Sequence, residues 1–247
     1  MTERNNMDTF HQSAWADEEF SKNYLEKADI YIPERRKMIG TMSSLFDYFY
    51  HDKRGSYVLD LGCGDGVLTE ALLAKQDSLI ATLVDGSRTM LQKARERLKS
   101  HPQLSFVEAS FQDILTGRAS LENYDFCVSS MAIHHLDMKE KTALFKYIAG
   151  HLKSNGRFVN IDVVLPPSEE LEEWYFSHWR EWMQKMFGQI NVKDEVPEDI
   201  IRRYKDPASM NRPDTLADQL GALKDAGLSE VDCYYKNGIF TVFGGKK

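Results

Sequence analysis

Cysteine, long apolar runs and an excess of basic residues are scarce or missing in this sequence. Its three cysteines, Cys63, Cys127 and Cys233, lie far apart and include no CxxC pair, which argues against a disulfide framework or a cysteine zinc site. No stretch approaches the ~18–20 apolar residues that span a bilayer. The first residues lack a basic start followed by an apolar run, so we expect no signal peptide, no membrane partner and a cytoplasmic protein with reduced thiols.

The charge balance is mildly acidic. Lys and Arg number 31 and Asp and Glu 38, a formal net charge of −7, so the chain as a whole does not attract phosphates. Basic residues cluster at 88–99 and 202–212, but acidic residues within or around them give the pattern of a solvated face. We therefore expect no nucleic-acid partner and a small-molecule substrate instead.

What the sequence does contain is an alternation of apolar runs and helical patterns between residues 56 and 165. The apolar runs predict strands at 57–61, 79–84, 104–107, 125–128 and 158–164, and the segments between them predict helices at 67–75, 89–99 and 139–152. Such alternation implies right-handed crossovers, and therefore an α/β fold with a doubly wound, mostly parallel sheet.

The chain ends differently. A helix is predicted at 213–226, and two strands at 231–235 and 239–243 flank an Asn-Gly pair, which is typical of an antiparallel hairpin. We interpret the chain as a single domain with a helical cap, the alternating core, a helical lid and a C-terminal helix with a hairpin, at 1–55, 56–165, 166–212 and 213–247.

Three glycines follow the first predicted strand, at Gly62, Gly64 and Gly66. Glycine there permits positive φ and lets a ligand approach the backbone, although a tight turn without a ligand has the same composition. Asp85 ends the second strand, where a carboxylate can accept both hydroxyls of a ribose. Together they indicate a nucleoside-type site. A dinucleotide is less favoured, because position 67 is Val where the GxGxxG fingerprint has its last glycine.

Three segments resemble the signatures of class I S-adenosylmethionine-dependent methyltransferases, in the right order and spacing. They are Val58-Leu59-Asp60-Leu61-Gly62-Cys63-Gly64-Asp65-Gly66, Val84-Asp85-Gly86-Ser87-Arg88-Thr89-Met90-Leu91 and Ser129-Ser130-Met131-Ala132-Ile133-His134-His135-Leu136. The resemblance implies a Rossmann-like sheet of seven strands, S-adenosyl-L-methionine as cofactor, and direct displacement of its methyl group by a small-molecule acceptor.

The resemblance also implies cofactor-binding roles. The glycines would pass under the methionine part, Asp60 would orient its ammonium group and Asp85 would bind the ribose. Gly86 and Met90 would border the adenine, although Met90 equally fits a core position on its helix. The full set is Tyr31, Arg35, Asp60, Gly62, Cys63, Gly64, Gly66, Asp85, Gly86, Met90, Ser110, Phe111 and Ser129.

Two parts of this set leave alternatives open. Ser110 stands where the family often has an acid that binds the adenine, with Phe111 flanking the ring, and Asp113 either takes over that role or caps the next helix. Tyr31 and Arg35 either lie over the cofactor, with Arg35 pairing with its carboxylate, or belong to a solvated turn.

The catalytic residue is harder to predict, because a sulfonium leaving group is already activated and a base is needed only for a protonated acceptor. His134 is the candidate, since it follows the fourth strand at the cofactor edge, while we expect His135 to be structural. Asp162 is either a further ionisable group at that edge or a buried structural acid. No helical zinc spacing occurs among the histidines, so we expect no metal.

A helix predicted at 168–187 is unusually aromatic, and one stripe of it follows helical spacing. Three interpretations remain: packing against the core, a lid over an acceptor pocket, or a contact between two copies of the chain. For the lid, the substrate-pocket candidates are His178, Trp179 and Trp182.

Two rival functions keep the cofactor. One is a different reaction carried out on the cofactor itself by an enzyme of the same fold. The other is a cofactor-binding scaffold or regulatory module without turnover, since intact glycines, Asp60 and Asp85 indicate binding and not catalysis.

Overall fold

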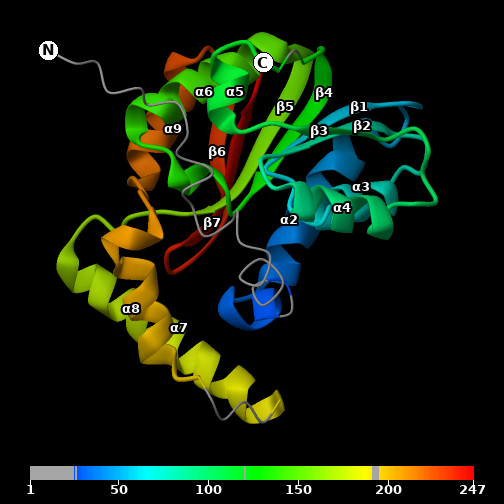
Figure 1. Cartoon of the computed structure of the whole chain (residues 1–247). Coiled ribbons are helices and arrows are strands. Elements are labelled where there is room, and N and C mark those ends of the chain that lie inside the picture. Colours follow the sequence, from blue (N-terminus) through cyan, green and yellow to red (C-terminus); the bar gives the residue numbers. More distant parts are fainter. Residues whose placement is uncertain (1–24, 26, 120, 191–194) are drawn as a thin grey trace, which may run out of the picture.

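The computed structural model describes residues 25, 27–119, 121–190 and 195–247, and its centre is one seven-stranded sheet (Figure 1). The strand order is β3-β2-β1-β4-β5-β7-β6. The strands are β1 (Tyr57–Leu61), β2 (Ile80–Asp85), β3 (Ser105–Glu108), β4 (Tyr124–Ser130), β5 (Leu152–Val163), β6 (Ser229–Asn237) and β7 (Phe240–Lys246). β1 to β5 are parallel and β7 pairs antiparallel with both β5 and β6, so the predicted sheet and its C-terminal hairpin are confirmed.

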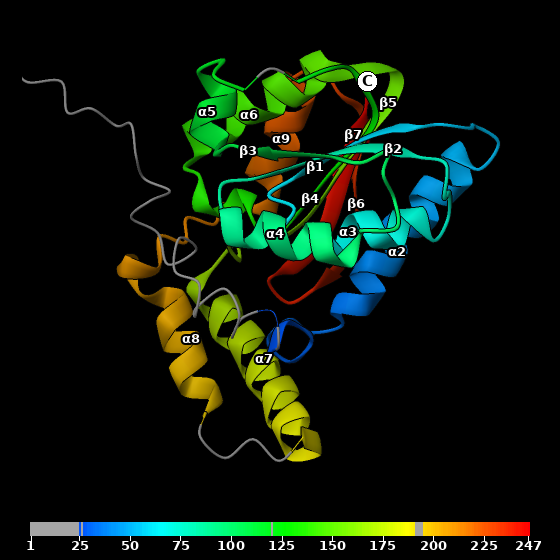
Figure 2. The ribbon, with the colours of Figure 1, turned by 45° about the vertical axis from the view of Figure 1, so that its right-hand side comes forward.

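Helices cover both faces of this sheet, as the turned view shows (Figure 2). One face carries α2 (Arg35–Tyr50), α3 (Val67–Leu73) and α4 (Arg88–Arg97), and the other carries α5 (Phe111–Leu115), α6 (Met138–His151) and α9 (Leu216–Asp225). Successive strand residues point to opposite faces, so Val58 packs with the α2–α4 side while Leu59 and Leu61 pack with the α5–α6–α9 side. Burial on both faces explains the continuous apolar runs of the sequence.

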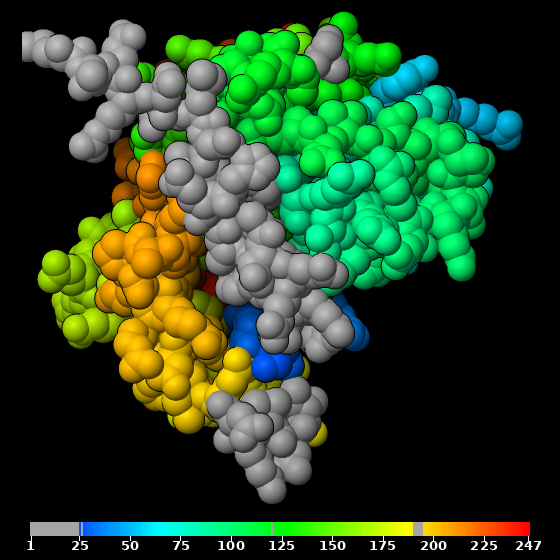
Figure 3. All heavy atoms as spheres, in the orientation of Figure 1, coloured from blue at the N-terminus to red at the C-terminus, as the bar shows by residue number. Residues whose placement is uncertain are grey.

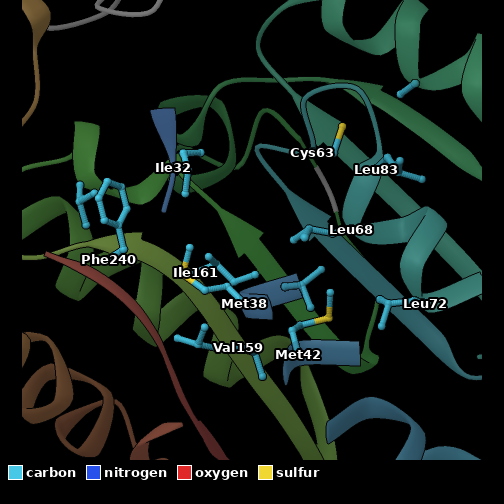
Figure 4. Close-up of a cluster of buried hydrophobic side chains, with 14 of the residues drawn as sticks. Ile32, Met38, Met42, Cys63, Leu68, Leu72, Leu83, Val159, Ile161 and Phe240 are labelled. Carbon is cyan, nitrogen blue, oxygen red and sulfur yellow. The ribbon is translucent and has the colours of Figure 1, made fainter. Parts of the chain in front are cut away.

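The α2–α3 side shows how this core is filled. Met38 and Met42 of α2 meet Leu68 and Leu72 of α3 above Val159 of β5 (Figure 4). Each of these side chains is at most 2% exposed, so the cap helix α2 is an integral part of the sheet core.

Two helices extend beyond the sheet layers. α7 (Glu169–Ile190) leaves after β5, and α8 (Pro197–Lys205) returns alongside it (Figures 1 and 2). In the space-filling view their yellow and orange atoms project below the cyan and green atoms of the sheet layers (Figure 3). α8 was not among the helices predicted from the sequence. Its apolar face is short and consists mainly of Ile200 and Ile201.

The C-terminal boundaries also shift. The last helix begins at Leu216, with the Thr215 side chain accepting a hydrogen bond from the backbone N–H of Asp218, and not at Pro213. In the hairpin, Asn237 pairs with Phe240, so the turn is Gly238-Ile239, with Gly238 at φ 59°. In the described ranges, no helix is both long and apolar enough to cross a bilayer.

Candidate functional site

The glycine turn after β1 has three glycines with three different environments. Gly62, at φ 64°, passes so close to the segment after β4 that a Cβ would lie 2.5 Å from Cβ of Ala132. Gly66, at φ 80°, packs against α4, where a Cβ would lie 2.9 Å from Leu98. Gly64, at φ 54°, has no atom within 4 Å of an added Cβ. Gly64 therefore faces open space, whereas Gly62 and Gly66 allow neighbouring segments to pack closely against the turn.

Asp85 ties this turn to the end of β2. One of its carboxylate oxygens accepts from the backbone N–H of Gly64 at 2.8 Å, and the other from Ser87 at 2.7 Å. Burial raises the pKa of Asp85 above its ordinary value, and these two backbone hydrogen bonds partly offset that rise. The sequence assigned Asp85 to a ligand alone, but the structure gives it a second task, which is to hold the glycine turn in place.

Asp60 is fully buried on β1 and has one unused oxygen. Its Oδ2 accepts from the Thr69 hydroxyl at 2.7 Å, while Oδ1 has no hydrogen-bond partner among the described residues. Burial raises the pKa of Asp60 to about 7, more than the Thr69 hydrogen bonds lower it. A buried carboxylate oxygen without a donor is unfavourable, so this atom fits a cationic or hydrogen-bond-donating ligand group.

These residues border a cavity of about 160 Å³ at the carboxyl edge of the sheet. Most of the predicted cofactor residues lie around it: Arg35, Asp60, Gly62, Cys63, Gly64, Asp85, Gly86, Met90, Ser110 and Phe111. The carboxyl ends of parallel strands and the loops that follow them meet at one edge, which explains why residues as far apart in sequence as Asp60 and Phe111 surround one space.

Three predicted cofactor residues do not line this cavity. The Tyr31 hydroxyl donates to Glu195 at 2.7 Å, and burial together with this carboxylate raises the pKa of Tyr31. The Ser129 hydroxyl donates to the carbonyl of Leu61 at 2.7 Å and so joins β4 to β1. Gly66, as described above, packs against α4. Tyr31, Gly66 and Ser129 therefore occupy structural positions, which differs from the prediction. Ser130, the neighbour of Ser129, lines the cavity instead.

The contacts of Arg35, Ser110 and Asp113 bear on the alternatives that the sequence left open for them. Arg35 lines the cavity and also pairs with Asp29 at 3.0 Å, so it is held in place by a partner of its own. Ser110 and Asp113 form a reciprocal capping box at the start of α5. Asp113 is therefore a helix cap, and Ser110 lines the cavity while its hydroxyl is engaged in that cap.

Met131 and Met210 line the cavity and were missed from the sequence. Both have positive φ, 51° and 59°, which is uncommon for a side-chain-bearing residue. The N–H of Met131 donates to Ile161 at 2.8 Å, which fixes this turn beside the sheet. No local signal marks Met210, because it comes from a connector that follows α8 and reaches the site only through the fold.

His134 is buried beside the sheet and does not line the cavity. Its Nδ1 lies 2.5 Å from Oδ1 of Asp162, and its backbone N–H donates to Oδ2 at 3.0 Å. Burial alone would raise the pKa of Asp162, but the His134 ring and Lys141 hold it below its ordinary value. Asp162 is therefore a buried, hydrogen-bonded acid, and His134, the predicted catalytic candidate, is its partner and does not line the cavity.

His135 has the position that we predicted for His134. It lines the cavity, and its Nδ1 lies 3.5 Å from the carbonyl oxygen of Met210. Burial, with a smaller contribution from His134, lowers the pKa of His135 to about 3, so the ring is neutral at physiological pH.

A buried network holds the connector of residues 206–214 against the sheet edge. The Lys141 side chain is 0% exposed, and its ammonium lies 2.5 Å from both the carbonyl of Arg212 and a carboxylate oxygen of Asp214. The N–H of Arg212 donates to the carbonyl of His134 at 2.7 Å. His134 and Lys141 are thus positioning residues, since they place the connector that carries Met210.

The aromatic helix packs as core. Trp179 is 6% exposed and donates its indole N–H to the carbonyl of Tyr31 at 2.7 Å, and Trp182 donates to Ile30 at 2.9 Å. His178 is exposed and contacts the ring of Trp174. The sequence offered His178, Trp179 and Trp182 as pocket residues of a lid, but none of them lines the cavity. The two tryptophans pack against the core instead, and His178 lies on the surface. In the described part of the chain, no three potential metal ligands converge.

Comparisons with known proteins concern the domain and the fold that contain this site. A family model described as a methyltransferase domain matches residues 58–156, the segment that carries the three signatures noted in the sequence. The O-methyltransferase family protein from Burkholderia thailandensis has the same fold, with a TM-score of 0.63 at 16% identity, covering 96% of this chain and 62% of that protein.

Two curated relatives show how far sequence similarity extends. Malonyl-acyl-carrier-protein O-methyltransferase of Halalkalibacterium halodurans is 29% identical over 124 residues, which covers 49% of this chain and 45% of that protein. Carboxy-S-adenosyl-L-methionine synthase of Chromohalobacter salexigens is 24% identical over 191 residues, which covers 75% of this chain and 66% of that protein. The chain spans about half the length of the first curated relatives that it matches.

Proposed function

We propose that this protein transfers a methyl group from S-adenosylmethionine to a small-molecule acceptor. The observation that carries the proposal is the unused Oδ1 of buried Asp60 in a cavity bounded by Gly64 and Asp85. An ammonium group would satisfy that oxygen, and a ribose would find a carboxylate at the end of β2. A nucleoside joined to an amino acid meets both requirements.

The residues that line the cavity include a partner for each part of such a cofactor. Asp60 and Arg35 have opposite charges that match the ammonium and carboxylate of an amino acid. Asp85 would accept from the ribose while it continues to hold Gly64. Phe111 and Met90 offer apolar surface for the adenine. Gly64 leaves room for the ligand where any side chain would intrude.

When bound, S-adenosylmethionine supplies a methyl group on a positively charged sulfur, a leaving group that needs no protonation. The chain's part is to align the acceptor and exclude water. Met131, Leu136 and Met210 supply apolar cover beside His135. With a pKa of about 3, His135 is a neutral hydrogen-bonding group that does not retain a proton near neutral pH. It therefore suits an acceptor whose attacking atom has already lost its proton.

Chemistry on the cofactor itself is the second candidate, and the similarity to carboxy-S-adenosyl-L-methionine synthase over 75% of this chain favours it. Incubation of the protein with S-adenosylmethionine labelled in its methyl group and a small-molecule extract distinguishes the outcomes. Labelled acceptor together with S-adenosylhomocysteine supports methyl transfer. A cofactor of increased mass supports the second candidate. Binding without either product indicates a regulatory or scaffold domain.

Binding itself is tested by calorimetry with S-adenosylhomocysteine. Asp85→Ala removes the ribose partner and the anchor of the glycine turn, so we expect affinity to fall at least about tenfold, or about 1.4 kcal/mol. The matched control is Asp77→Ala, which alters a carboxylate that is 90% exposed and outside the cavity. Equal affinity of the wild type and the Asp85 variant would contradict the assignment.

A further inference from the structure

A second cavity lies beside the first and shares part of its wall. It measures about 260 Å³ and is bounded by α5, the start of α6 and the connector of residues 206–214. Gln112, His135 and Met210 line both cavities. A molecule in the second cavity would therefore border the cofactor site at His135, the neutral ring discussed above.

The acidic residues around this second cavity are engaged in helix capping. Asp137 accepts from the backbone N–H of Glu140 at 2.8 Å, and Glu140 accepts in return from the N–H of Asp137 at 3.0 Å. The other carboxylate oxygen of Glu140 accepts from the Gln112 amide at 3.1 Å. These hydrogen bonds begin α6 and reduce the capacity of both carboxylates to bind a ligand.

The basic residues of the same wall are not engaged in this way. Lys139 and Arg212 both line the cavity and are exposed, and within the described ranges neither side chain has a carboxylate within 4 Å. Lys141 differs, since its ammonium is buried and bound to Asp214. The positive end of α6, a helix of 14 residues, faces the same region.

We propose that this second cavity is the acceptor subsite and that it binds an acidic group, a carboxylate or a phosphate, of the small molecule to be methylated. The proposal rests on the proposed function, because it places the acceptor against the cofactor cavity. Arg212 and Lys139 would hold the acidic group, and the shared wall at His135 would direct the rest of the molecule towards the cofactor. The two cations are contributed by α6 and by the connector, so the subsite exists only when the connector is docked.

The test uses the full chain saturated with S-adenosylhomocysteine. Malonate, inorganic phosphate and the neutral analogue malonamide are titrated separately, and binding is followed by the NMR signals of the arginine Nε–H groups and of the backbone at residues 138–140. We expect saturable shifts with at least one of the two anions and none with malonamide. A response to malonate alone identifies a carboxylate site, and a response to phosphate alone identifies a phosphate site.

Variants locate the binding. Arg212→Gln and Lys139→Gln should each weaken anion binding about tenfold, the loss of one charge-assisted contact. Lys146→Gln, which removes an exposed lysine two turns further along α6, and Arg202→Gln on α8 are the matched controls and should bind as the wild type does. Circular dichroism confirms that each variant is folded.

Three results would overturn the proposal: no saturable shift with either anion, equal binding of malonamide, or unchanged anion affinity in the double variant of Arg212 and Lys139. S-adenosylhomocysteine affinity is measured on the same samples. Failure of that binding refutes the proposed function, whereas intact binding without an anion response refutes the acceptor subsite alone.

Discussion

The carboxyl edge of β1, β2 and β4 and the α7–α8 pair both contain chemically rich side chains, but they use them differently. At the sheet edge, Asp60 keeps an unused oxygen and Gly64 faces open space. In α7, Trp179 and Trp182 satisfy their indole N–H groups with backbone carbonyls and bury their rings or pack them against the core. The sheet edge leaves a hydrogen-bond acceptor and space for a ligand, while α7 uses its hydrogen-bond donors within the protein.

This difference shows why residue type alone is a poor guide to function. An aromatic helix near a cofactor edge has the composition of a lid. Its indole groups nevertheless join α7 to the segment before α2, which makes α7 a structural support. A carboxylate on a central strand has the composition of a structural acid, as Asp162 proves to be, yet Asp60 on β1 is only half satisfied. The unsatisfied atom, and not the residue type, marks the site.

The largest effect is expected from the structural region. Trp179→Ala should lower the free energy of unfolding by ~3–5 kcal/mol, because it leaves a cavity between Tyr204 and Phe240 and removes a buried hydrogen bond. Denaturant titration measures this loss. Trp174→Ala is the control on the same helix, since Trp174 is 53% exposed and its loss should change stability little. Selective loss of ligand binding without loss of stability would restore the lid interpretation.

Gly64→Val should have the largest effect on the cofactor edge. A branched side chain would fill the open space and is strained at φ 54°, so S-adenosylhomocysteine affinity should fall at least about a hundredfold, or about 3 kcal/mol. Gly227→Val is the matched control, since Gly227 has φ 91°, no atom within 4 Å of an added Cβ and a place after α9. Scanning calorimetry should show a lower melting temperature for both variants, because both side chains are strained. Titration calorimetry should show lost S-adenosylhomocysteine binding only for Gly64→Val.

Lys141→Met should loosen the connector. The substitution keeps the length of the buried stem but removes the ammonium that bonds Arg212 and Asp214, so we expect a loss of roughly 1–3 kcal/mol in stability. Hydrogen exchange should increase at residues 206–214 before the rest of the sheet opens. Lys146→Met, an exposed position on the same helix, should leave both measurements unchanged. Uniform exchange across the domain would contradict the role of Lys141 as an anchor.

Asp60→Asn should give the smallest effect and the clearest pH dependence. The folded pKa of about 7 lies above the ordinary aspartate value of 3.8, so the folded chain binds the proton more tightly than the unfolded chain does. The free energy of unfolding of the unliganded wild type should therefore fall as the pH rises from about 4 to about 7. The Asn variant has no group that titrates at this position, so its free energy of unfolding should fall less over the same range. Thermal melts between pH 4 and pH 8 measure it.

The same variant should respond oppositely in binding. At pH 8 the ionised Asp60 would pair with a ligand ammonium, so Asp60→Asn should weaken S-adenosylhomocysteine about tenfold. Wild-type affinity should increase between pH 6 and pH 8 more than that of the variant. Parallel profiles for the two proteins would mean that the unused oxygen does not contact the ligand.

Much of the fold was predictable, and so were several residues that gather at the carboxyl edge of the sheet. The strand runs, Gly62, Gly64 and Asp85 are local patterns whose geometry follows from a strand, a tight turn and a helix in succession. The sequence placed His134 at the site and His135 in a structural position, whereas His135 lines the cavity and His134 meets Asp162. Adjacent residues in a short 3₁₀ turn point in different directions, and their sequence neighbours do not show which one meets the acid. α8 was missed because only a few apolar positions mark it.

The sequence by itself determined the sheet, its order of strands and helices and the glycine turn at the cofactor edge, since each depends on neighbours within a few residues. The tertiary structure alone decided that Trp179 and Trp182 belong to the core, that Asp60 keeps a free oxygen, and that the connector brings Met210 and Arg212 to His135. The places of the tryptophans and of the connector depend on which atoms meet across 70 or more positions of chain, as the contact of His135 with Met210 illustrates. Packing and hydrogen bonding between distant segments are satisfied only when the whole domain is assembled.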